Sequence, residues 1–337
     1  MRSQNATHPR LLADIGGTHA RFAMQNHQAD KLSHLAVYKC AQFETLESCV
    51  KQYLADHRPQ RPVAGAMGIA TQIMGDWVSM SNSPWAFSTA ELKAALALEQ
   101  LLIINDFTAL ALSLPALIGT DLYCIHPGHA VPGSPLALIG PGTGLGVSGL
   151  FTDQQGGLVP ISGEGGHVTL SADNPLEVAV VESLKGRFGH ASAERALSGQ
   201  GLINLYQALC AIENRACEQL QSHDIVARAL LQSDKNCIMA LNLFFSFLGS
   251  TCGNLALTLG ARGGIFIGGG TVPGMLPALE QSQFLSRYLQ KGRYREYLRQ
   301  IPIHVITAGV SPALIGAGRA LDEAAHAHQS CSTKRNH

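Results

Sequence analysis

Two glycine-rich turns, each between two apolar segments, are the stretches of this chain best suited to bind phosphate. The first, Asp14-Ile15-Gly16-Gly17-Thr18, follows Leu11-Leu12-Ala13. The second, Gly140-Pro141-Gly142-Thr143-Gly144-Leu145-Gly146, follows Leu136-Ala137-Leu138-Ile139. Glycine lets backbone N–H groups approach an anion closely, and a neighbouring threonine hydroxyl adds another donor. Together the two turns predict a nucleotide clamp made of two phosphate-binding hairpins.

Neither turn is a Walker A loop, because no Gly-Lys-Ser/Thr sequence follows and the next element reads as a strand. The first turn alone is equally consistent with an ordinary tight hairpin. Asp14 ends a buried strand, where an unpaired carboxylate is costly, and holding hydrated Mg²⁺ is one reason to place it there. The second turn is the stronger signal, since it has four glycines in seven residues.

Asn105 and Asp106 follow the apolar segment 101–104, which reads as a short strand. In open α/β sheets, ligands collect at the carboxyl ends of the strands. The functional interpretation is therefore a general base, Asp106, beside a hydrogen-bonding amide, Asn105. The alternative is that Asp106 only caps the helix that follows.

The glycine-rich loop 162–167 places Glu164 and His167 three positions apart, so that both could hydrogen-bond a polyol. Taken alone, His167 could equally be a metal ligand, a core histidine or a surface residue, and the absence of a following cysteine cluster disfavours structural zinc. Glu194 alone indicates no more than an exposed, salt-bridging residue near a helix start. The cluster Gly268-Gly269-Gly270 could let an adenine or ribose lie against the backbone, or it could form a bulge or a helix start.

The composition favours a compact globular enzyme. The chain has 337 residues, 46% hydrophobic and 14% charged, and its 24 basic and 24 acidic residues balance. This length predicts two domains, and the neutral charge gives no reason to expect nucleic acid or an anionic membrane as a partner. We find no secretory signal and no uncharged apolar run near the ~20 residues that span a bilayer. A cytoplasmic location is therefore expected.

Periodicity predicts the elements that must position these residues. Besides the two hairpins, strands are expected at 34–38, 63–71, 76–80, 101–104, 264–267 and 301–306. Helices are expected within 43–54, 89–98, 107–114, 176–185, 200–212, 223–232, 237–258 and 311–321. Strands that alternate with helices indicate an α/β sheet domain, and the second hairpin restarts the pattern.

Seven motifs in this order resemble those of the bacterial glucokinase family, over roughly residues 11 to 322. They are Ala13-Asp14-Ile15-Gly16-Gly17-Thr18-His19-Ala20-Arg21, Asn82-Ser83-Pro84-Trp85-Ala86-Phe87-Ser88, Ile104-Asn105-Asp106-Phe107-Thr108-Ala109, Gly142-Thr143-Gly144-Leu145-Gly146, Gly163-Glu164-Gly165-Gly166-His167, Ser192-Ala193-Glu194-Arg195 and Gly268-Gly269-Gly270. This family is the hexokinase-type branch of the actin/Hsp70/sugar-kinase fold. The related ROK branch has a cysteine-rich zinc motif after its histidine, whereas residues 168–173 here contain no cysteine.

The resemblance implies an α/β, two-lobed, actin-like ATPase (ribonuclease H-like) fold, with mixed sheets flanked by helices and an interlobe cleft. The expected small domain comprises residues 1–117 and about 309–337, and the large domain residues 118–308. The implied reaction is ATP-dependent phosphorylation of D-glucose to glucose 6-phosphate. A kinase for another hexose or an N-acetylhexosamine, and a non-catalytic sugar sensor, remain the alternatives. The family also implies a homodimer.

The resemblance assigns roles residue by residue. The expected ATP-binding residues are Ala13, Asp14, Ile15, Gly16, Gly17, Thr18, Gly142, Thr143, Gly144 and Gly269. Asp14 would also hold Mg²⁺ through water. The expected sugar-binding residues are Asn105, Asp106, Glu164, His167 and Glu194, and Asp106 would be the catalytic base.

Overall fold

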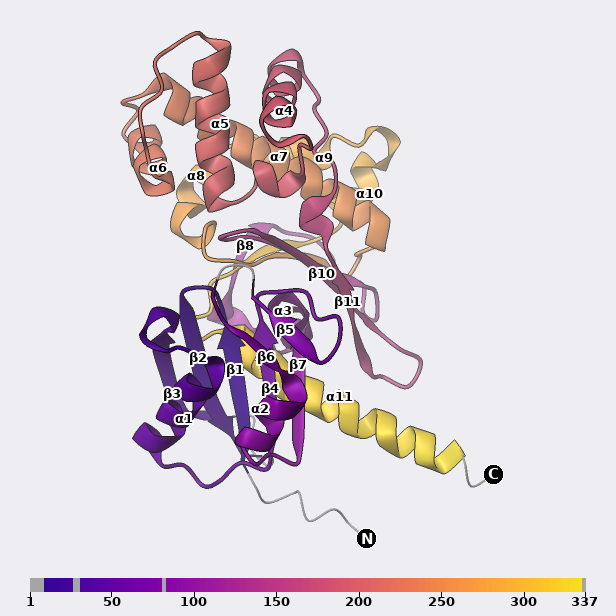
Figure 1. The fold of residues 1–337 in the computed structure, drawn as a ribbon. Coiled ribbons are helices and arrows are strands. Elements are labelled where there is room, and N and C mark those ends of the chain that lie inside the picture. Colours follow the sequence, from indigo (N-terminus) through magenta and orange to yellow (C-terminus); the bar gives the residue numbers. More distant parts are fainter. Residues whose placement is uncertain (1–8, 27–30, 81–82, 335–337) are drawn as a thin grey trace. The chain divides into compact units, whose positions relative to one another are not determined.

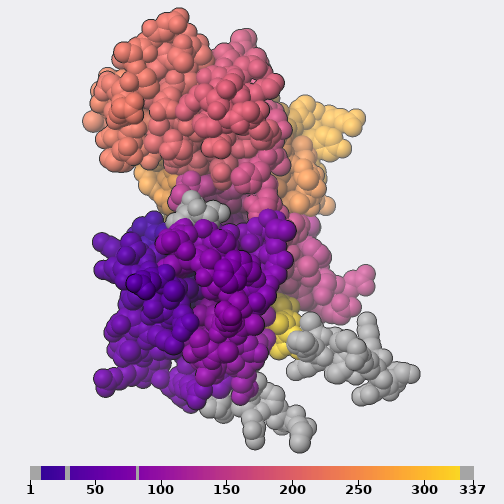
Figure 2. All heavy atoms as spheres, in the orientation of Figure 1, coloured from indigo at the N-terminus to yellow at the C-terminus, as the bar shows by residue number. Residues whose placement is uncertain are grey.

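Contacts within the chain define two compact units, which we describe separately. The computed structural model describes residues 9–26, 31–80 and 83–334, with side chains up to residue 326, so Asn82 of the second motif lies outside it. The first unit takes its residues from 1–119, 152–162 and 308–337, and the second from 120–151 and 163–307. In the space-filling view, the indigo and purple atoms of the first unit lie together with the yellow atoms from near the C-terminus (Figure 2).

The first unit is built on a five-stranded sheet of order β3-β2-β1-β4-β7 (Figure 1). Its strands are β1 (Arg10–Ile15), β2 (His19–Gln25), β3 (Leu32–Lys39), β4 (Ala64–Ile69) and β7 (Gln100–Asn105). The hairpin β1–β2 and the pair β2–β3 are antiparallel, whereas β4 and β7 continue the sheet in parallel. A separate small sheet pairs β5 (Trp77–Ser79) with β6 (Ala86–Ser88). The predicted first hairpin is therefore confirmed.

Four α-helices belong to this unit: α1 (Leu46–His57), α2 (Thr89–Ala95), α3 (Asp106–Ser113) and α11 (Pro312–Lys334). Short 3₁₀ turns lie at η2 (Cys40–Gln42) and η3 (Leu114–Ala116), and η4 (Gly119–Asp121) spans the point in the sequence where the first unit ends and the second begins. The predicted start of α2 is confirmed, because the Ser88 side chain accepts a hydrogen bond from the Glu91 N–H at 3.1 Å. The last helix extends well beyond the predicted end at Leu321.

Both faces of the first sheet are covered, because successive side chains of a strand point to opposite faces. On one face, Leu11 and Ile15 belong to a cluster with Phe22 and with Tyr53 of α1. On the other face, Leu12 clusters with residues of α11, among them Leu314, Ala317 and Leu321. The helix nearest the C-terminus thus forms part of the core around the first strand.

The second unit contains a six-stranded sheet of order β11-β10-β9-β12-β13-β8, whose end strand β11 lies almost wholly in a segment grouped with the first unit. Its strands are β8 (Leu122–His126), β9 (Leu136–Pro141), β10 (Leu145–Thr152), β11 (Leu158–Gly163), β12 (Gly264–Ile267) and β13 (Ile303–Ile306). The second predicted hairpin, β9–β10, is antiparallel as expected, and β12 pairs with β9 in parallel. The outermost strands, β8 and β11, were not predicted.

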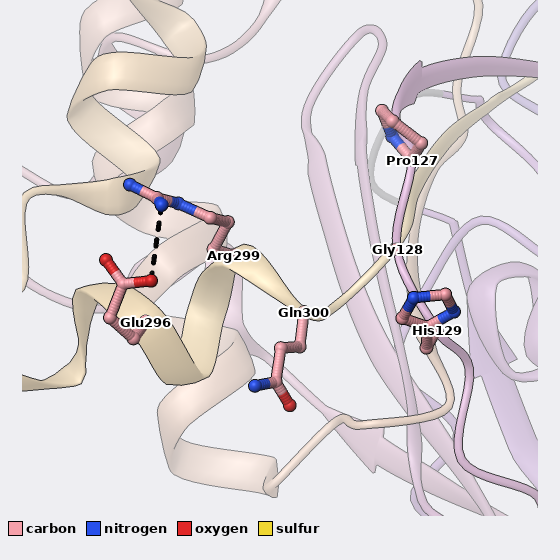
Figure 3. A pocket seen from close by; sticks show the side chains of 6 residues that line it. All are labelled: Pro127, Gly128, His129, Glu296, Arg299 and Gln300. Atoms are coloured by element: carbon pink, nitrogen blue, oxygen red, sulfur yellow. Dashed lines mark ion pairs between the residues drawn. The ribbon is translucent and has the colours of Figure 1, made fainter.

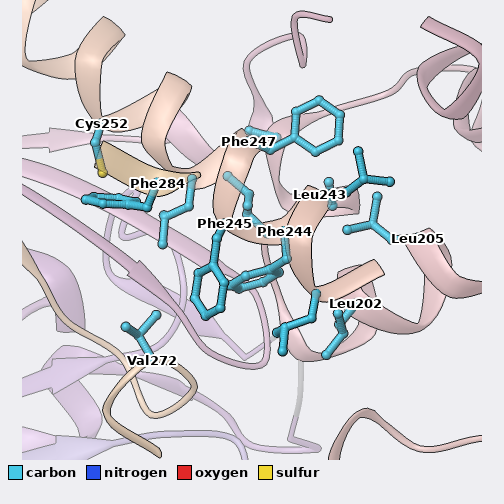
Figure 4. Close-up of a cluster of buried hydrophobic side chains, with 14 of the residues drawn as sticks. Leu202, Leu205, Leu243, Phe244, Phe245, Phe247, Cys252, Val272 and Phe284 are labelled. Atoms are coloured by element: carbon cyan, nitrogen blue, oxygen red, sulfur yellow. The ribbon is translucent and has the colours of Figure 1, made fainter. Parts of the chain in front are cut away.

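The helices of the second unit are α4 (Pro175–Phe188), α5 (Gly199–Ile212), α6 (Ser222–Leu230), α7 (Lys235–Leu259), α8 (Leu276–Gln281), α9 (Phe284–Leu289) and α10 (Arg295–Arg299). The remaining 3₁₀ turns are η5 (Gly165–His167), η6 (Ala193–Arg195), η7 (Pro273–Met275) and η8 (Gly292–Tyr294). Apolar side chains of α5, α7 and α9 pack together in the core of this unit (Figure 4). The four helices predicted from 176 to 258 are confirmed, whereas α8 to α10 were missed.

Helix α7 corrects one sequence expectation. It is long and apolar enough to cross a membrane by length and composition, although no such run was expected. Two thirds of its most apolar window (67%) is buried inside the protein. Phe244, Phe247 and Leu248 of this helix are all fully buried. The apolar character of α7 is therefore explained by its place in the core of the second unit.

Candidate active site

The first unit aligns its candidate residues at the carboxyl edge of three parallel strands. Ile15 on β1 pairs with Ile69 on β4, and Ile69 pairs with Asn105 on β7. Asp14 lies one residue before this row and Asp106 one residue after it. The sheet therefore brings together two motifs that are about 90 residues apart in the sequence. Each motif lies at a strand end, as the sequence predicted.

A glycine on the middle strand allows the start of α3 to lie close to the sheet. Gly68 pairs with Asp14 in the register of β1 and β4. A Cβ added at Gly68 would lie 3.0 Å from the Ala109 Cβ and 3.4 Å from the Asp106 Cα. A larger residue here would therefore crowd the start of α3 where it lies against β4.

Asn105, and not Asp106, is the residue that caps α3. The Asn105 Oδ1 accepts hydrogen bonds from the backbone N–H groups of Phe107 and Thr108, at 2.9 and 3.2 Å. Its Nδ2 donates to Asp106 Oδ1 at 3.1 Å. Asp106 is the first residue of α3, where the positive end of the helix dipole favours a carboxylate. The arrangement holds one oxygen of Asp106 in place beside the amide of Asn105.

The first turn of α3 contacts the start of the loop that carries Glu164. The hydroxyl groups of Thr108 and Ser162 lie 2.9 Å apart, and both residues belong to the first unit. Ser162 is the first residue of the glycine-rich loop 162–167.

The first glycine-rich turn is closed by backbone hydrogen bonds. Gly16 N–H donates to His19 O at 3.0 Å, and Cys40 N–H donates to Thr18 O at 2.9 Å. The Cys40 thiol also donates to Gly16 O at 3.3 Å, and burial raises the pKa of this thiol, which keeps it protonated as a donor. The turn is therefore held from one side by Cys40, the residue that follows β3.

Asp14 has protein partners of its own. Ser311 Oγ donates to Asp14 Oδ2 at 2.7 Å, and Arg21 Nη1 lies 3.3 Å from the same oxygen. The sequence offered Mg²⁺ as one reason for a carboxylate at this position, and these two donors provide another, because they pair the carboxylate within the protein. Within the described residues, no bond to Asp14 Oδ1 is found.

Asp14 nevertheless fits a magnesium site. Its side chain is 15% exposed, and carboxylate oxygen is a preferred Mg²⁺ ligand. No cluster of three or more His, Cys, Asp or Glu side chains suited to a metal occurs in the described part of the chain. A site with one carboxylate suits Mg²⁺, which usually keeps several waters and binds substrate phosphates, and not a metal that needs a full protein cage.

In the second unit, the other glycine-rich turn is bonded directly to Glu194. Gly142 N–H donates to Gly144 O at 2.8 Å, and Leu145 N–H donates to Glu194 Oε2 at 2.9 Å. A Cβ added at Gly144 would lie 2.5 Å from that same oxygen. The N-terminus of α5 also holds the turn, because Gly199 N–H donates to Gly142 O at 2.9 Å. The absence of a side chain at Gly144 thus leaves room for the Glu194 carboxylate in this position.

The structure brings the loop of Glu164 and His167 next to the segment of Glu194. Leu170 N–H donates to Ala191 O, and Ala193 N–H donates to Val168 O, both at 2.9 Å. These bonds flank an isolated bridge between residues 169 and 192. Both Glu164 and His167 are exposed.

This loop also packs on the second hairpin. A Cβ added at Gly166 would contact the carbonyl oxygen of Leu145, the residue whose N–H is bonded to Glu194. The proposed sugar-binding residues of this unit and its glycine-rich turn therefore form one continuous group. The sequence motifs alone did not reveal this arrangement.

Gly269 lies beside the same hairpin. Its φ is +78°, and a Cβ at this position would contact the carbonyl oxygen of Pro141. Gly268 N–H donates to Ile139 O at 2.8 Å. Both the positive φ and the close approach to β9 require glycine here. The third glycine cluster is thus explained by packing, and it lies next to the turn expected to bind phosphate.

Sequence reasoning missed the two partners of Asp14. A signal existed for Arg21, because it stands directly opposite Asp14 in the register of the predicted hairpin. No local signal pointed to Ser311, which is 297 residues away in the sequence.

A separate pocket of about 430 Å³ in the second unit is lined by Pro127, Gly128, His129, Glu296, Arg299 and Gln300 (Figure 3). None of the sequence-predicted site residues lines it. Arg299 forms an ion pair with Glu296 at 3.3 Å, so the one guanidinium in this pocket lining is already neutralised. We assign no role to this pocket.

Comparisons with known proteins agree with the resemblance. A glucokinase family model matches residues 11–324. A glucokinase from Aromatoleum aromaticum is 47% identical over 319 residues, which are 94% of this chain and 96% of that protein. The crystal structure of a glucokinase from an Antarctic psychrotroph has a TM-score of 0.84 at 35% identity, covering 93% of this chain and 98% of that one.

A more distant solved structure shares the fold. A ROK family glucokinase from Streptomyces griseus, in complex with glucose and AMPPNP, has a TM-score of 0.62 at 16% identity and covers 92% of this chain and 97% of that one. The expected α/β fold of the actin-like sugar kinases, with mixed sheets flanked by helices, is thereby confirmed. With a family model and a close relative that both span nearly all of its length, this chain belongs to the glucokinase family.

Proposed function

We propose that this chain transfers the γ-phosphoryl group of ATP to the 6-hydroxyl of D-glucose. The observation that carries the proposal is the bond between Leu145 N–H and Glu194 Oε2, at 2.9 Å. It joins the glycine-rich turn 142–144, suited to phosphate, to a carboxylate suited to sugar hydroxyls. Phosphoryl transfer requires the donor phosphate and the acceptor hydroxyl to lie side by side.

In this proposal Asp106 is the general base. The oxygen of the 6-hydroxyl attacks the γ-phosphorus, its proton passes to the Asp106 carboxylate, and ADP leaves with the electron pair of the broken P–O bond. The contact from Asn105 Nδ2 to Asp106 Oδ1, at 3.1 Å, orients the carboxylate. A fixed base is favourable because positioning supplies most of the protein's contribution to this chemistry.

The other roles follow from the family and from the geometry within each unit. Residues 13–18 and 142–144 bind the phosphates through backbone N–H groups, and Gly269 leaves room for the nucleotide. Asp14 would hold Mg²⁺ through water, and the ion would supply positive charge to the phosphates. Glu164, His167, Glu194 and Asn105 bind glucose hydroxyls. A solved relative that shares the fold contains both glucose and an ATP analogue, which supports these two substrates.

We also propose a cytoplasmic homodimer, as the family resemblance implies. The balanced charge, with 24 basic and 24 acidic residues, supports small-molecule substrates over nucleic acid or an anionic membrane.

A coupled assay of ADP release, run over a panel of hexoses and N-acetylhexosamines, tests the activity. Asp106→Asn should lower kcat by about 10²–10⁴-fold and leave ADP affinity unchanged. Near-normal turnover in that variant would remove Asp106 as the base. Faster turnover of another sugar would make the chain a kinase for that sugar, and glucose binding without ADP release would make it a sensor.

A further inference from the structure

Ser311 is held at one end of the C-terminal helix and bonded to the carboxylate that ends β1. Its hydroxyl donates to Asp14 Oδ2 at 2.7 Å, and Arg21 Nη1 approaches the same oxygen at 3.3 Å. Asp14 therefore has one oxygen fixed from two directions, by a neutral and by a charged donor. Its other oxygen, Oδ1, has no such bond within the described residues.

The helix behind Ser311 is tightly packed. A Cβ added at Gly316 would overlap the carbonyl oxygen of Ala109 on α3, so the two helices touch through their backbones. Leu314 is 1% exposed, and Arg10 pairs with Asp322 at 2.7 Å. Such close-packed contacts leave little freedom for the residue that precedes the helix.

The same packing reaches Asp106, because α3 begins at that residue. Helix α11 is thus linked to both candidate carboxylates. Ser311, the residue before α11, bonds to Asp14, and α11 packs against α3, which begins at Asp106. Asp14 and α3 also meet across Gly68 of β4.

We infer that Ser311 is a positioning residue for this reaction. Together with Arg21 it fixes Asp14 Oδ2, so that Oδ1 is the oxygen presented to a metal-bound water. The inference rests on the proposed role of Asp14. A hydrogen bond to a carboxylate that must keep one orientation is a usual way to hold a metal-binding group.

The test measures metal binding directly and does not depend on turnover. Mn²⁺ serves as the probe in place of Mg²⁺, and its binding to the enzyme–ADP complex is followed by electron paramagnetic resonance. Ser311→Ala should weaken Mn²⁺ binding by about 3- to 30-fold, the loss expected when a carboxylate loses one hydrogen bond. Ser311→Thr, which keeps the hydroxyl, should restore most of the affinity.

A control is Ser33→Ala, because the Ser33 hydroxyl also makes hydrogen bonds in the first unit, to Met24 O at 3.2 Å and with His34 Nδ1 at 3.1 Å. This variant should bind Mn²⁺ as the parent protein does. Thermal unfolding of every variant without metal or nucleotide separates a loss of folding from a loss of positioning. In steady state, Ser311→Ala should raise the Mg²⁺ concentration for half-maximal rate and leave KM for glucose unchanged.

The outcomes distinguish this inference from the proposed function. If Asp14→Asn weakens Mn²⁺ binding but Ser311→Ala does not, Ser311 is only part of the helix start and the inference is overturned. If Asp14→Asn has no effect either, Asp14 does not hold the metal and the inference also fails, without contradicting glucose phosphorylation. Absence of ADP release with every sugar, in a protein that binds Mn²⁺–ADP normally, would contradict the proposed function alone.

Discussion

Glu194 Oε2 accepts a hydrogen bond from Leu145 N–H at 2.9 Å, across 49 positions of the sequence. The same carboxylate therefore contacts the turn that we propose binds phosphate, and it belongs to the residues that we propose bind the sugar. A change that breaks this bond should affect both substrates, because the two residues are in direct contact.

The two functions of Glu194 can be separated by comparing two substitutions. Glu194→Gln keeps an oxygen for the Leu145 N–H but loses the charge, so it should raise KM for glucose by about 10- to 100-fold and leave KM for ATP nearly unchanged. Glu194→Ala also leaves the Leu145 N–H without this partner, so it should raise both KM for glucose and KM for ATP. Equal effects of the two variants on KM for ATP would show that the bond to Leu145 does not support the turn. Steady-state kinetics with each substrate varied separately provides the measurement.

Gly144→Ala should impair catalysis with little effect on the fold. The added Cβ would lie 2.5 Å from Glu194 Oε2, so the carboxylate or the turn must move. We expect kcat/KM to fall more than about tenfold for both substrates, since small displacements of positioning groups are costly. Gly186→Ala is the control, because nothing lies within 4 Å of its added Cβ. Unchanged kinetics in Gly144→Ala would mean that the site tolerates a displaced Glu194.

The start of the long core helix provides a prediction on stability. The Asp234 side chain is 6% exposed, caps α7 and accepts from the N–H groups of Asn236 and Cys237 at 2.7 and 3.1 Å. Burial alone would raise the pKa of Asp234, but these two bonds, with Arg215 and Arg228 nearby, hold it below its ordinary value. Asp234→Ala should lower the free energy of unfolding by about 1–2 kcal/mol at pH 7.

The pH dependence of this effect has a definite sign. A depressed pKa in the folded state means that Asp234 stabilises the protein fully above its unfolded pKa of about 3.9. That stabilisation is lost as the pH falls through the folded pKa, so the parent protein and the variant should converge in acid. Urea unfolding of the parent protein and of Asp234→Ala, at several values between neutral and acid pH, measures this convergence. Glu182→Gln, which alters an exposed pair with Lys185, should change stability by less than about 0.5 kcal/mol. If the difference in unfolding free energy between the parent protein and Asp234→Ala stays constant in acid, the charge of Asp234 is not its cause.

Local patterns were sufficient for much of the fold. The hairpins β1–β2 and β9–β10 were predicted because apolar runs and glycine-rich turns are properties of adjacent residues. Strand β8 was missed because its residues are partly or wholly exposed and show no clear alternation. Helices α8 to α10 were missed because each has only five or six residues, and none has a side-chain cap bond.

The site was less accessible to sequence reasoning, because its contacts are long-range. Asp106 at a strand end could be selected from residue types alone, and Asn105 beside it could be expected. Glu194 was selected by family resemblance only, since its bond to Leu145 joins segments that share no local pattern. The pairing of Asp14 with Ser311 depends on how the C-terminal helix packs, which no window of the sequence describes.

The place of α11 in the first unit has a consequence for how the chain is made. Leu12 and Ala23, near the start of the chain, share a buried cluster with Leu314 and Leu321. During synthesis on a ribosome, the first sheet must wait for these late residues before both of its faces are covered. The second unit draws its residues only from 120–307, so it can finish folding earlier. The unit that is translated first is therefore completed last, and until then its uncovered apolar face is a surface for chaperones or for aggregation.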